Sequence, residues 1–484
     1  AVPGFWLVTG LRRLLDPATG IYVNPSGDQV QWERPCSLEL IHPDGSPGFQ
    51  INCGVRIRGG FSRSADNPKH AFRFFFRSAY GSAKLDYKLF GDTPGAAEEF
   101  DKLDLRCAQN YSWSYGGDWR GIFIRDTVAR DLQLAAGHVS SHGACYHLYV
   151  NGQYWGLFNI DERPDANFGA SYFGGEADDY DAVKVDPDIG YNIEATDGTT
   201  EAWQALWSLA DTGLSGSFTE TQNNTTYQRL LGNHPDGTPN PAYPVLVDPV
   251  NLIDEMLIVY WGGNLDAPIS DFLGNASPNN WFGVRDRTGG HGGFRFILHD
   301  SEHTMLDLNQ NRTGPWPAGS SAQQGTAAFG KSSPQYIFQQ CIHAQEFKAL
   351  FADRVYRHFY HDGVLTPGGA TAIFDARAAE IDRAVVAESA RWGDAKTAAP
   401  LTRNHWLGEI NNVRNNYLAG RPAIVLSQFR AQGWYPAFDP PALGPPGGSV
   451  APGAPAPTPP GTGTPAPMHS SAPESLLAYL DSAP

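Results

Sequence analysis

Residues 55–77 read VRIRGGFSRSADNPKHAFRFFFR, and this stretch decides the class of fold. Residues 55–58 alternate an aliphatic side chain with an arginine, and residues 72–77 place phenylalanine at every second position. A period of two is typical of a strand with one buried face. The glycines between the two runs indicate a turn at residues 58–63. The stretch therefore predicts strands of a small antiparallel sheet, which we extend back to about Cys36.

The residues that follow add a helix and a hairpin. Residues 122–134 carry apolar side chains at helical spacing. Residues 147–158 contain two apolar-rich runs on either side of Asn151 and Gly152, a dipeptide typical of a tight hairpin turn. The N-terminal part of the chain is therefore expected to mix sheet and helix.

The second half of the chain has mainly helical patterns. Residues 252–261 predict a buried helix, and residues 293–298 predict a strand. Another helix, over about residues 370–392, is amphipathic. Helical spacing also relates the apolar residues Phe347, Leu350, Phe351, Val355 and Phe359. We therefore expect an α+β fold with a strand-rich N-terminal lobe and a helix-rich C-terminal lobe.

Composition shifts suggest where these parts begin and end. Residues 440–467 contain 11 Pro and 6 Gly, a composition typical of an extended linker. Residues 191–250 are rich in Asn, Gly, Thr and Pro and are interpreted as an insertion with one short helix near residues 203–209. The predicted organisation is an N-terminal extension (1–35), the strand-rich lobe and hinge (36–190), the insertion (191–250), the helix-rich lobe (251–435), the linker (436–472) and a C-terminal stub (473–484).

The overall composition excludes two classes of protein. The chain has 484 residues, 41% of them apolar, and 51 Asp and Glu against 35 Lys and Arg give a formal charge of -16. Because this charge repels a phosphate backbone, a general nucleic-acid-binding role is not expected. The longest apolar runs fall far short of the roughly 20 residues that a membrane-spanning helix needs. We therefore expect a protein without a membrane span.

The five cysteines have no CxxC spacing, which argues against a zinc or redox motif. Two disulfides, Cys36 with Cys53 and Cys107 with Cys145, are one interpretation, which leaves Cys341 free. Five buried free thiols are the other. The sequence leaves both open.

Two motif matches are rejected or held as minor alternatives because of their context. Residues 325–332 fit the P-loop pattern GxxxxGK[ST], but a proline-containing loop precedes them where a P-loop needs a buried strand. Residues 299–303 fit the zinc pattern HxxEH, which requires a helix. They follow a strand-like run instead, so His299 and His303 need not converge. A zinc hydrolase remains the least favoured hypothesis.

A third set of residues is consistent with phosphoryl transfer. Such chemistry needs a carboxylate to orient the attacking hydroxyl, and an amide and a second carboxylate to hold divalent metal on the phosphates. Asp266, Asn280 and Asp300 occur in the order that a kinase catalytic loop and metal-binding carboxylate take. Asp and Asn are also common in turns and helix caps, which is the ordinary alternative.

The chain carries a family resemblance in these same segments. The segments that carry it are residues 56–63, 68–73, 149–158 with Glu162, 263–266, 279–281 and 299–302. Taken together, they resemble the CotH kinase family of spore-coat and secreted proteins, over about residues 36–430. Residues 388–394 resemble the branch found in large multidomain bacterial surface proteins.

This resemblance implies an atypical protein-kinase-like bilobal fold that binds ATP with Mg²⁺ or Mn²⁺ and phosphorylates Ser or Thr of protein substrates. It implies an extracellular or cell-surface location, and other domains of a larger surface protein as further partners. The implied catalytic residue is Asp266, the implied metal ligands are Asn280, Asp300 and Glu302, and the implied nucleotide-binding residues are Arg58, Gly59, Gly60, Ser62, Lys69, Glu162 and Lys184.

Some features depart from the family pattern. Many members have Asp where this chain has Glu302, which places the second metal-facing carboxylate one methylene further out. Asp266 and Asn280 are 14 positions apart, so residues 267–278 must fold away from the site. A catalytically inactive kinase-like scaffold within a surface protein is therefore the alternative function.

Overall fold

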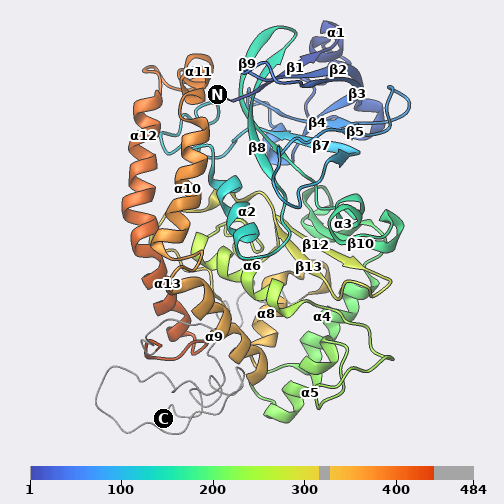
Figure 1. Ribbon diagram of the computed structural model, residues 1–484, viewed down its shortest axis with the longest axis vertical. Coiled ribbons are helices and arrows are strands. Elements are labelled where there is room, and N and C mark those ends of the chain that lie inside the picture. Colours follow the sequence, from blue (N-terminus) through green and yellow to red (C-terminus); the bar gives the residue numbers. More distant parts are fainter. Residues whose placement is uncertain (1, 315–327, 441–484) are drawn as a thin grey trace.

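The computed structural model describes residues 2–314 and 328–440 as a mixed α/β fold, and the alternating strands of the sequence form its barrel (Figure 1). The barrel strands follow one another around the wall in the order β1, β2, β3, β4, β7, β9 and β8. They are β1 (Gly4–Val8), β2 (Arg34–Ile41), β3 (Phe49–Arg58), β4 (Ala71–Phe75), β7 (Lys102–Arg106), β8 (Gly143–Val150) and β9 (Gln153–Asp161). The prediction of antiparallel strands around residues 55–75 is confirmed. The strands belong to a closed barrel of seven strands rather than to a small sheet of their own.

Strand β1 closes the barrel. It pairs antiparallel with β2 and parallel with β8, so it joins the two edges that an open sheet would leave. A helix of five residues, α1 (Leu11–Leu15), follows it. Residues 1–35, predicted as an extension, thus supply a wall of the barrel.

The barrel interior shows why the alternating pattern works. Val55 lies opposite Phe74 and Arg56 lies opposite Arg73 across β3 and β4. Val55 and Phe74 are buried in the barrel core, whereas both arginines remain partly exposed. The hairpin between β8 and β9 turns at Asn151 and Gly152, both with positive φ, as the sequence predicts.

A second sheet lies below the barrel in Figure 1, and the candidate site lies at the ends of its strands. It has the order β11 (Asn192–Asp197), β10 (Tyr180–Asp186), β12 (Trp281–Asp286) and β13 (Arg295–Leu298). Helix α6 (Pro249–Gly262) packs on β13, with Asp248 capping its N-terminus. A two-stranded ribbon, β5 (Leu85–Asp86) with β6 (Glu99–Phe100), completes the strands of the described residues.

Helices form the rest of the molecule and its largest core. Helix α9 carries the predicted apolar face, with Leu350 only partly buried and the other four residues buried. The predicted helix over residues 370–392 is interrupted at residues 382–383 and forms α10 and α11. The helices are α2 (Arg125–Ala135), α3 (Ala166–Phe173), α4 (Glu201–Gly213), α5 (Glu220–Leu230), α8 (Pro334–Cys341), α9 (Gln345–Phe359), α10 (Pro367–Ile381), α11 (Ala384–Trp392), α12 (Arg403–Asn412) and α13 (Ala419–Ala431).

The predicted insertion is folded into the helical part. Helix α4 contains the short helix predicted at residues 203–209, and it packs on α8, while α5 packs on α9. The predicted linker lies almost entirely, and the stub entirely, outside the described residues. Within residues 2–314 and 328–440, no helix is both long and apolar enough to cross a bilayer.

All five cysteines are buried free thiols. Cys36 and Cys53 lie opposite one another on β2 and β3, with their sulfur atoms 3.5 Å apart. The structure therefore agrees with the interpretation of five unpaired thiols.

Candidate active site

A pocket of about 400 Å³ lies between the barrel and the second sheet, and we call it the central pocket. The barrel supplies the end of β3, the turn after it and Arg73 of β4. The second sheet supplies β10 and the ends of β12 and β13. The predicted site residues that line this pocket are Arg58, Gly59, Gly60, Ser62, Lys184, Asp266, Asn280 and Asp300.

The turn after β3 requires glycine at position 59. Gly59 has φ of 121°, and a Cβ built there would lie 1.8 Å from the Ser62 hydroxyl oxygen. Any other residue would be strained and would displace Ser62. A short helical turn, η2 (Phe61–Arg63), follows. The backbone can therefore approach a bound molecule closely here.

Two arginines of the pocket are held by one buried carboxylate. The Arg58 Nε donates to Asp104 at 2.8 Å, and the Arg73 Nη2 donates to the same carboxylate at 2.7 Å. These cations outweigh the effect of burial and hold the pKa of Asp104 far below its ordinary value. The Arg58 Nη2 also donates to the His299 Nε2 at 3.0 Å. The two guanidinium groups are thus fixed before any ligand arrives.

Asp266 lies in the segment after α6 and accepts three hydrogen bonds. The amides of Asn279 and Asn280 donate to its Oδ2 at 3.1 and 3.0 Å, and Ser270 donates to its Oδ1. Burial raises the pKa of Asp266 to about 6, and the nearby negative charge of Asp300 adds to this. A carboxylate with such a pKa is suited to accept a proton near neutral pH.

Asn280 and Asp300 precede and follow the β12–β13 pair. Both have left-handed backbones, with φ of 47° and 53°. This conformation is uncommon for residues other than glycine and is often found at functional sites. The Asn280 amide nitrogen donates to Asp266, and within the described residues its amide oxygen accepts no hydrogen bond. That oxygen is therefore available as a ligand.

Asp300 pairs with Arg106, a buried residue at the centre of a charge network. The carboxylates that contact Arg106 are Asp126 at 3.6 Å, Asp161 at 3.4 Å, Glu302 at 3.3 Å and Asp300 itself. Arg130 also pairs with Asp126 and Asp161. Burial and the neighbouring carboxylates raise the pKa of Asp161 to about 6 and that of Glu302 to about 7. Four carboxylates thus face two guanidinium groups.

The residues present fit a magnesium ion bound together with phosphates. Mg²⁺ takes oxygen ligands and commonly uses only one or two carboxylates besides substrate phosphates. Asn280 and Asp300 supply such oxygens, and the excess negative charge near Asp300 favours a cation. Among the described residues, no group of three or more His, Cys, Asp or Glu side chains is arranged to hold a metal alone.

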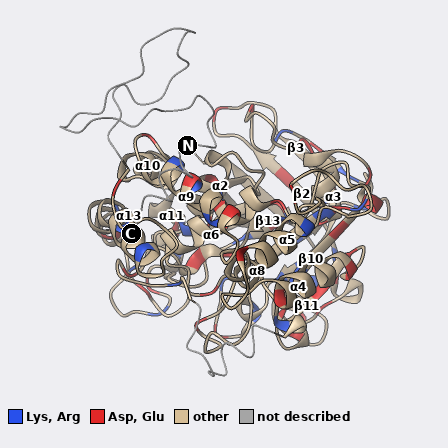
Figure 2. Cartoon of the chain, turned by 90° about the horizontal axis from the view of Figure 1, so that it is seen from below, with Lys and Arg blue, Asp and Glu red and all other residues tan. Residues whose placement is uncertain are grey.

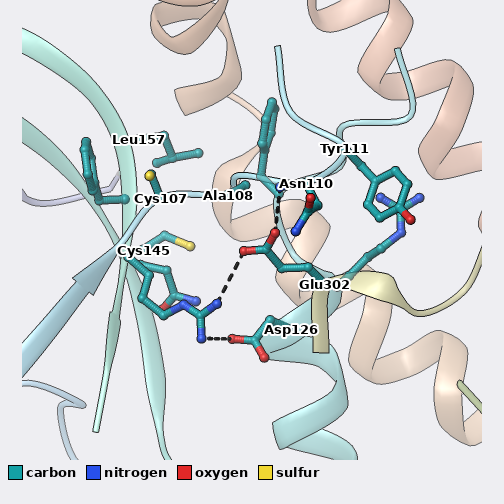
Figure 3. Close-up of a pocket in the computed structure, with 13 residues that line it drawn as sticks. Cys107, Ala108, Asn110, Tyr111, Asp126, Cys145, Leu157 and Glu302 are labelled. Atoms are coloured by element: carbon teal, nitrogen blue, oxygen red, sulfur yellow. Dashed lines mark hydrogen bonds and ion pairs between the residues drawn. The ribbon is translucent and has the colours of Figure 1, made fainter. Parts of the chain in front are cut away.

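Glu302, the third predicted metal ligand, lies away from the central pocket. It lines a small cavity and points between Asn110 and Asp126 (Figure 3). Its Oε2 accepts from the Asn110 backbone N–H at 2.8 Å, and its Oε1 accepts from Arg106. In this structure, Glu302 therefore holds the segment around residue 110 in place.

Two of the predicted nucleotide-binding residues also lie elsewhere. The buried Lys69 ammonium donates to Glu388 of α11 at 2.6 Å and to the Leu157 carbonyl at 2.8 Å. Glu162 accepts from the Tyr172 hydroxyl at 2.7 Å and from the His142 backbone N–H at 2.8 Å. Neither lines the central pocket in the described part of the chain. By contrast, Lys184 lines it and pairs with Glu194 at 2.7 Å.

The central pocket is also lined by Arg163, which the sequence patterns missed. Arg163 and Arg73 are both cations. The Arg163 guanidinium lies 5.5 Å from the centre of the Phe282 ring, and no ion pair within the described residues involves it. Burial and repulsion by Arg73 lower the pKa of Arg163 to about 10, which still leaves it charged at neutral pH. Its position next to the predicted Glu162 was the available signal.

Within the described residues, neither of the two other motif matches forms a site of its own. His299 contacts Arg58, whereas the His303 Nδ1 lies 2.9 Å from the Tyr111 hydroxyl, so the two imidazoles have separate partners. The first residues of the P-loop match lie outside the described residues. Its Lys331 donates to the Tyr191 carbonyl at 3.0 Å.

Figure 2 shows acidic and basic residues interspersed along the same helices and strands. The central pocket is lined by six cations, Arg56, Arg58, Arg63, Arg73, Arg163 and Lys184, and by six carboxylates, Asp28, Asp186, Asp188, Glu194, Asp266 and Asp300. Three of these cations pair with carboxylates of the same lining: Arg56 with Asp28, Arg63 with Asp188 and Lys184 with Glu194. Cations and carboxylates that line one pocket suit a ligand that carries several negative charges together with a metal.

In a comparison with known families, the family described as CotH kinase protein matches residues 55–424, a range that includes Asp266, Asn280 and Asp300. The chain matches none of the curated proteins with which it was compared.

Proposed function

Because the chain belongs to the CotH kinase family, we propose that it is an ATP- and Mg²⁺-dependent kinase that phosphorylates Ser or Thr of proteins. The observation that carries the proposal is the meeting of Asp266, Asn280 and Asp300 with several cations at one pocket. In this proposal the barrel and the second sheet with its helices correspond to the two lobes of a kinase.

Seven residues of the pocket have a role in the proposed reaction. Asp266 orients the acceptor hydroxyl and takes its proton, because it is buried and has a raised pKa. Asn280 and Asp300 hold the metal, which neutralises charge on the phosphates when bound. Arg58 and Arg163 bind the phosphates, and the turn at Gly59 and Gly60 lets backbone N–H groups approach them.

The proposed substrates are extracellular or surface proteins, including other domains of a larger surface protein. This part of the proposal rests on the resemblance to secreted, multidomain members of the family.

The experiment that tests the proposal separates binding from transfer. ATP is titrated into the chain by calorimetry with and without Mg²⁺ or Mn²⁺, and transfer of labelled phosphate to dephosphorylated casein is measured. We expect Asp300→Asn to weaken metal-dependent ATP binding at least about tenfold. We expect Asp266→Asn to keep binding and to slow transfer by about 10²- to 10⁴-fold.

Asp92→Asn is the matched control, because that carboxylate is 99% exposed and distant from the pocket lining. It should bind ATP and transfer phosphate as the unmodified chain does. Absence of ATP binding with every metal would contradict the proposal.

An inactive kinase-like scaffold is the second candidate. It is favoured by the ion pair between Asp300 and Arg106, which occupies the carboxylate that a metal would need. Metal-dependent binding of ATP without transfer to any acceptor would support a nucleotide-binding scaffold.

A further inference from the structure

A second hollow, of about 580 Å³, lies beside the central pocket. Its walls carry the aromatic rings of Tyr111, Tyr115, Trp119 and Phe272, together with Asp118 and Arg120. We call it the aromatic groove. It has no place in the nucleotide and metal chemistry described above.

The aromatic groove is continuous with the central pocket on the side of Asp266. Asn110 and His303 line both hollows. The Leu265 backbone N–H, immediately before Asp266, donates to the His303 carbonyl at 3.1 Å. The proposed phosphate-binding residues Arg58 and Arg163 line only the central pocket. A molecule in the groove would therefore reach Asp266 from a different side than the nucleotide.

Two rings of the groove, and one ring next to it, are exposed although they are large and apolar. Phe272 is 59% exposed and Trp119 is 55% exposed, and Phe61 on the glycine turn is 67% exposed and contacts the edge of Tyr115. These rings come from three segments that are far apart in the sequence. Exposed aromatic rings that gather around one hollow are typical of a binding surface.

The groove is held in shape before any ligand binds. The Phe272 ring packs on the His303 ring at 4.6 Å, and the Tyr111 hydroxyl lies 2.9 Å from the His303 Nδ1. The loop that carries Phe272 is tied by Arg312, which donates to Asn275 at 2.8 Å. This is the loop, residues 267–278, that separates Asp266 from Asn280.

The charges of the groove neutralise each other. The Arg120 guanidinium donates twice to Asp118, at 3.0 and 2.7 Å, and lies 4.8 Å from the Tyr111 ring centre. Ring faces are therefore the main surface offered to a ligand, and these favour apolar and aromatic side chains over charged ones.

We propose that the aromatic groove binds the acceptor segment of the protein substrate, through an aromatic or large aliphatic side chain a few residues from the phosphorylated Ser or Thr. This inference rests on the proposed kinase function, because the groove adjoins the carboxylate that would receive the acceptor hydroxyl. It gives the long loop between Asp266 and Asn280 a role as one wall of the acceptor site.

The test uses synthetic peptides with one serine in a Gly and Ala background and one Phe placed at each position on either side. Binding is measured by fluorescence anisotropy of a terminal dye, with Mg²⁺ and a non-hydrolysable ATP analogue present. We expect one placement to bind at least about tenfold more tightly than the peptide without Phe. The same placement should be the best substrate in a transfer assay.

The variants Phe272→Ala and Trp119→Ala should each reduce this preference to less than about threefold. Phe218→Ala is the matched control, because Phe218 is 39% exposed and does not line either hollow. It should retain the preference. Thermal melting of each variant shows whether it is folded.

The outcomes separate the inference from the proposed function. If one peptide binds preferentially and Phe272→Ala removes this preference, but phosphate is transferred neither to any peptide nor to casein, the groove is supported and the kinase function is overturned. Equal binding of all peptides would overturn the groove, whether or not casein is phosphorylated. A Trp119→Ala variant that loses affinity for the ATP analogue while keeping the peptide preference would also overturn it, because the groove would then bind the nucleotide.

Discussion

At the scale of single residues, Asp104 lies outside the lining of the central pocket but holds two of the arginines that line it. Its buried carboxylate pairs with both Arg58 and Arg73, and Asp104→Asn leaves both guanidinium groups without that partner charge. We expect the free energy of unfolding to fall by about 3–5 kcal/mol, as for other buried pairs that lose one partner. Denaturation in urea measures this. ATP affinity should fall in the same variant, because both arginines lose their fixed positions.

The effect of Asp104→Asn should depend on pH with a definite sign. The folded protein holds the pKa of Asp104 below its unfolded value, so the carboxylate stabilises the fold above about pH 4 and loses this effect as pH falls further. The difference in the free energy of unfolding between Asp104→Asn and the unmodified chain should therefore become smaller in acid. Asp382→Asn removes a partly exposed carboxylate that also binds an arginine, Arg403, and should change stability little at any pH. An equal loss of stability in both variants would contradict the assigned role of Asp104.

Glu255 is a buried carboxyl with the opposite behaviour. It lies fully buried in α6, its Oε2 has no hydrogen-bond partner within the described residues, and burial alone raises its pKa well above the ordinary value. The folded state thus retains a proton that the unfolded state releases, so this group lowers stability as pH rises above its unfolded pKa. Glu255→Gln should raise the free energy of unfolding at pH 8 by about 1–3 kcal/mol.

The same Glu255→Gln comparison at about pH 3 provides the control, because the unfolded pKa of Glu is about 4.3. There the carboxyl is largely protonated in both states, so the stabilisation should shrink towards zero. A gain of equal size at both pH values would indicate a packing effect and contradict the assigned cause.

At the scale of elements, the sequence predicts what local periodicity determines. Helix α9 and the β8–β9 hairpin follow from apolar spacing and from Asn151–Gly152, since both depend on residues close in sequence. Barrel closure depends on β1 meeting β8, which is more than a hundred positions away. No local pattern in Gly4–Val8 specifies that partner.

For the candidate site too, the sequence predicted some residues correctly and misplaced or missed others. The family resemblance suggested Asp266, Asn280 and Asp300, and all three line the central pocket, although their functional roles remain proposals. Lys69 matched a motif position but pairs with Glu388, because a buried ammonium needs a carboxylate and α11 brings one. Arg163 was missed, since a single arginine after a strand has no distinctive pattern.

The Lys69–Glu388 pair joins the barrel to helix α11, and its removal is a test at this scale. Both side chains are 2% exposed, so Lys69→Met should lower the free energy of unfolding by about 3–5 kcal/mol. Adding Glu388→Leu should recover part of this loss, because no unpaired charge then remains buried. Urea denaturation of the two single variants and the double variant gives the interaction free energy between Lys69 and Glu388.

ATP binding distinguishes the two roles of Lys69. If the residue is only a link between barrel and helix, the folded double variant should bind ATP with the affinity of the unmodified chain. A loss of ATP affinity at preserved stability would instead return Lys69 to the nucleotide site.

At the scale of the whole molecule, the barrel and the second sheet both line the central pocket. The turn at Gly59 belongs to the barrel, whereas Asp266, Asn280 and Asp300 belong to the second sheet and its helices. Further contacts join the same two parts, including the Trp392 indole that donates to the Trp155 carbonyl at 2.7 Å. A ligand that contacts both walls should therefore stabilise both parts together.

We expect ATP with Mg²⁺ to slow hydrogen exchange in two separate segments, the turn at residues 58–63 and the loop at residues 264–280. The melting temperature should rise with ATP concentration, since a ligand present at 100 times its Kd adds about 2.7 kcal/mol to the stability of the folded state. Exchange followed by mass spectrometry, with and without ATP and Mg²⁺, measures the protection of each segment. Asp300→Asn should lose protection in both segments at once, because the metal-dependent contact is shared. Protection of one segment alone would mean that the ligand contacts only one wall, and the central pocket would then not be the site where the two parts act together.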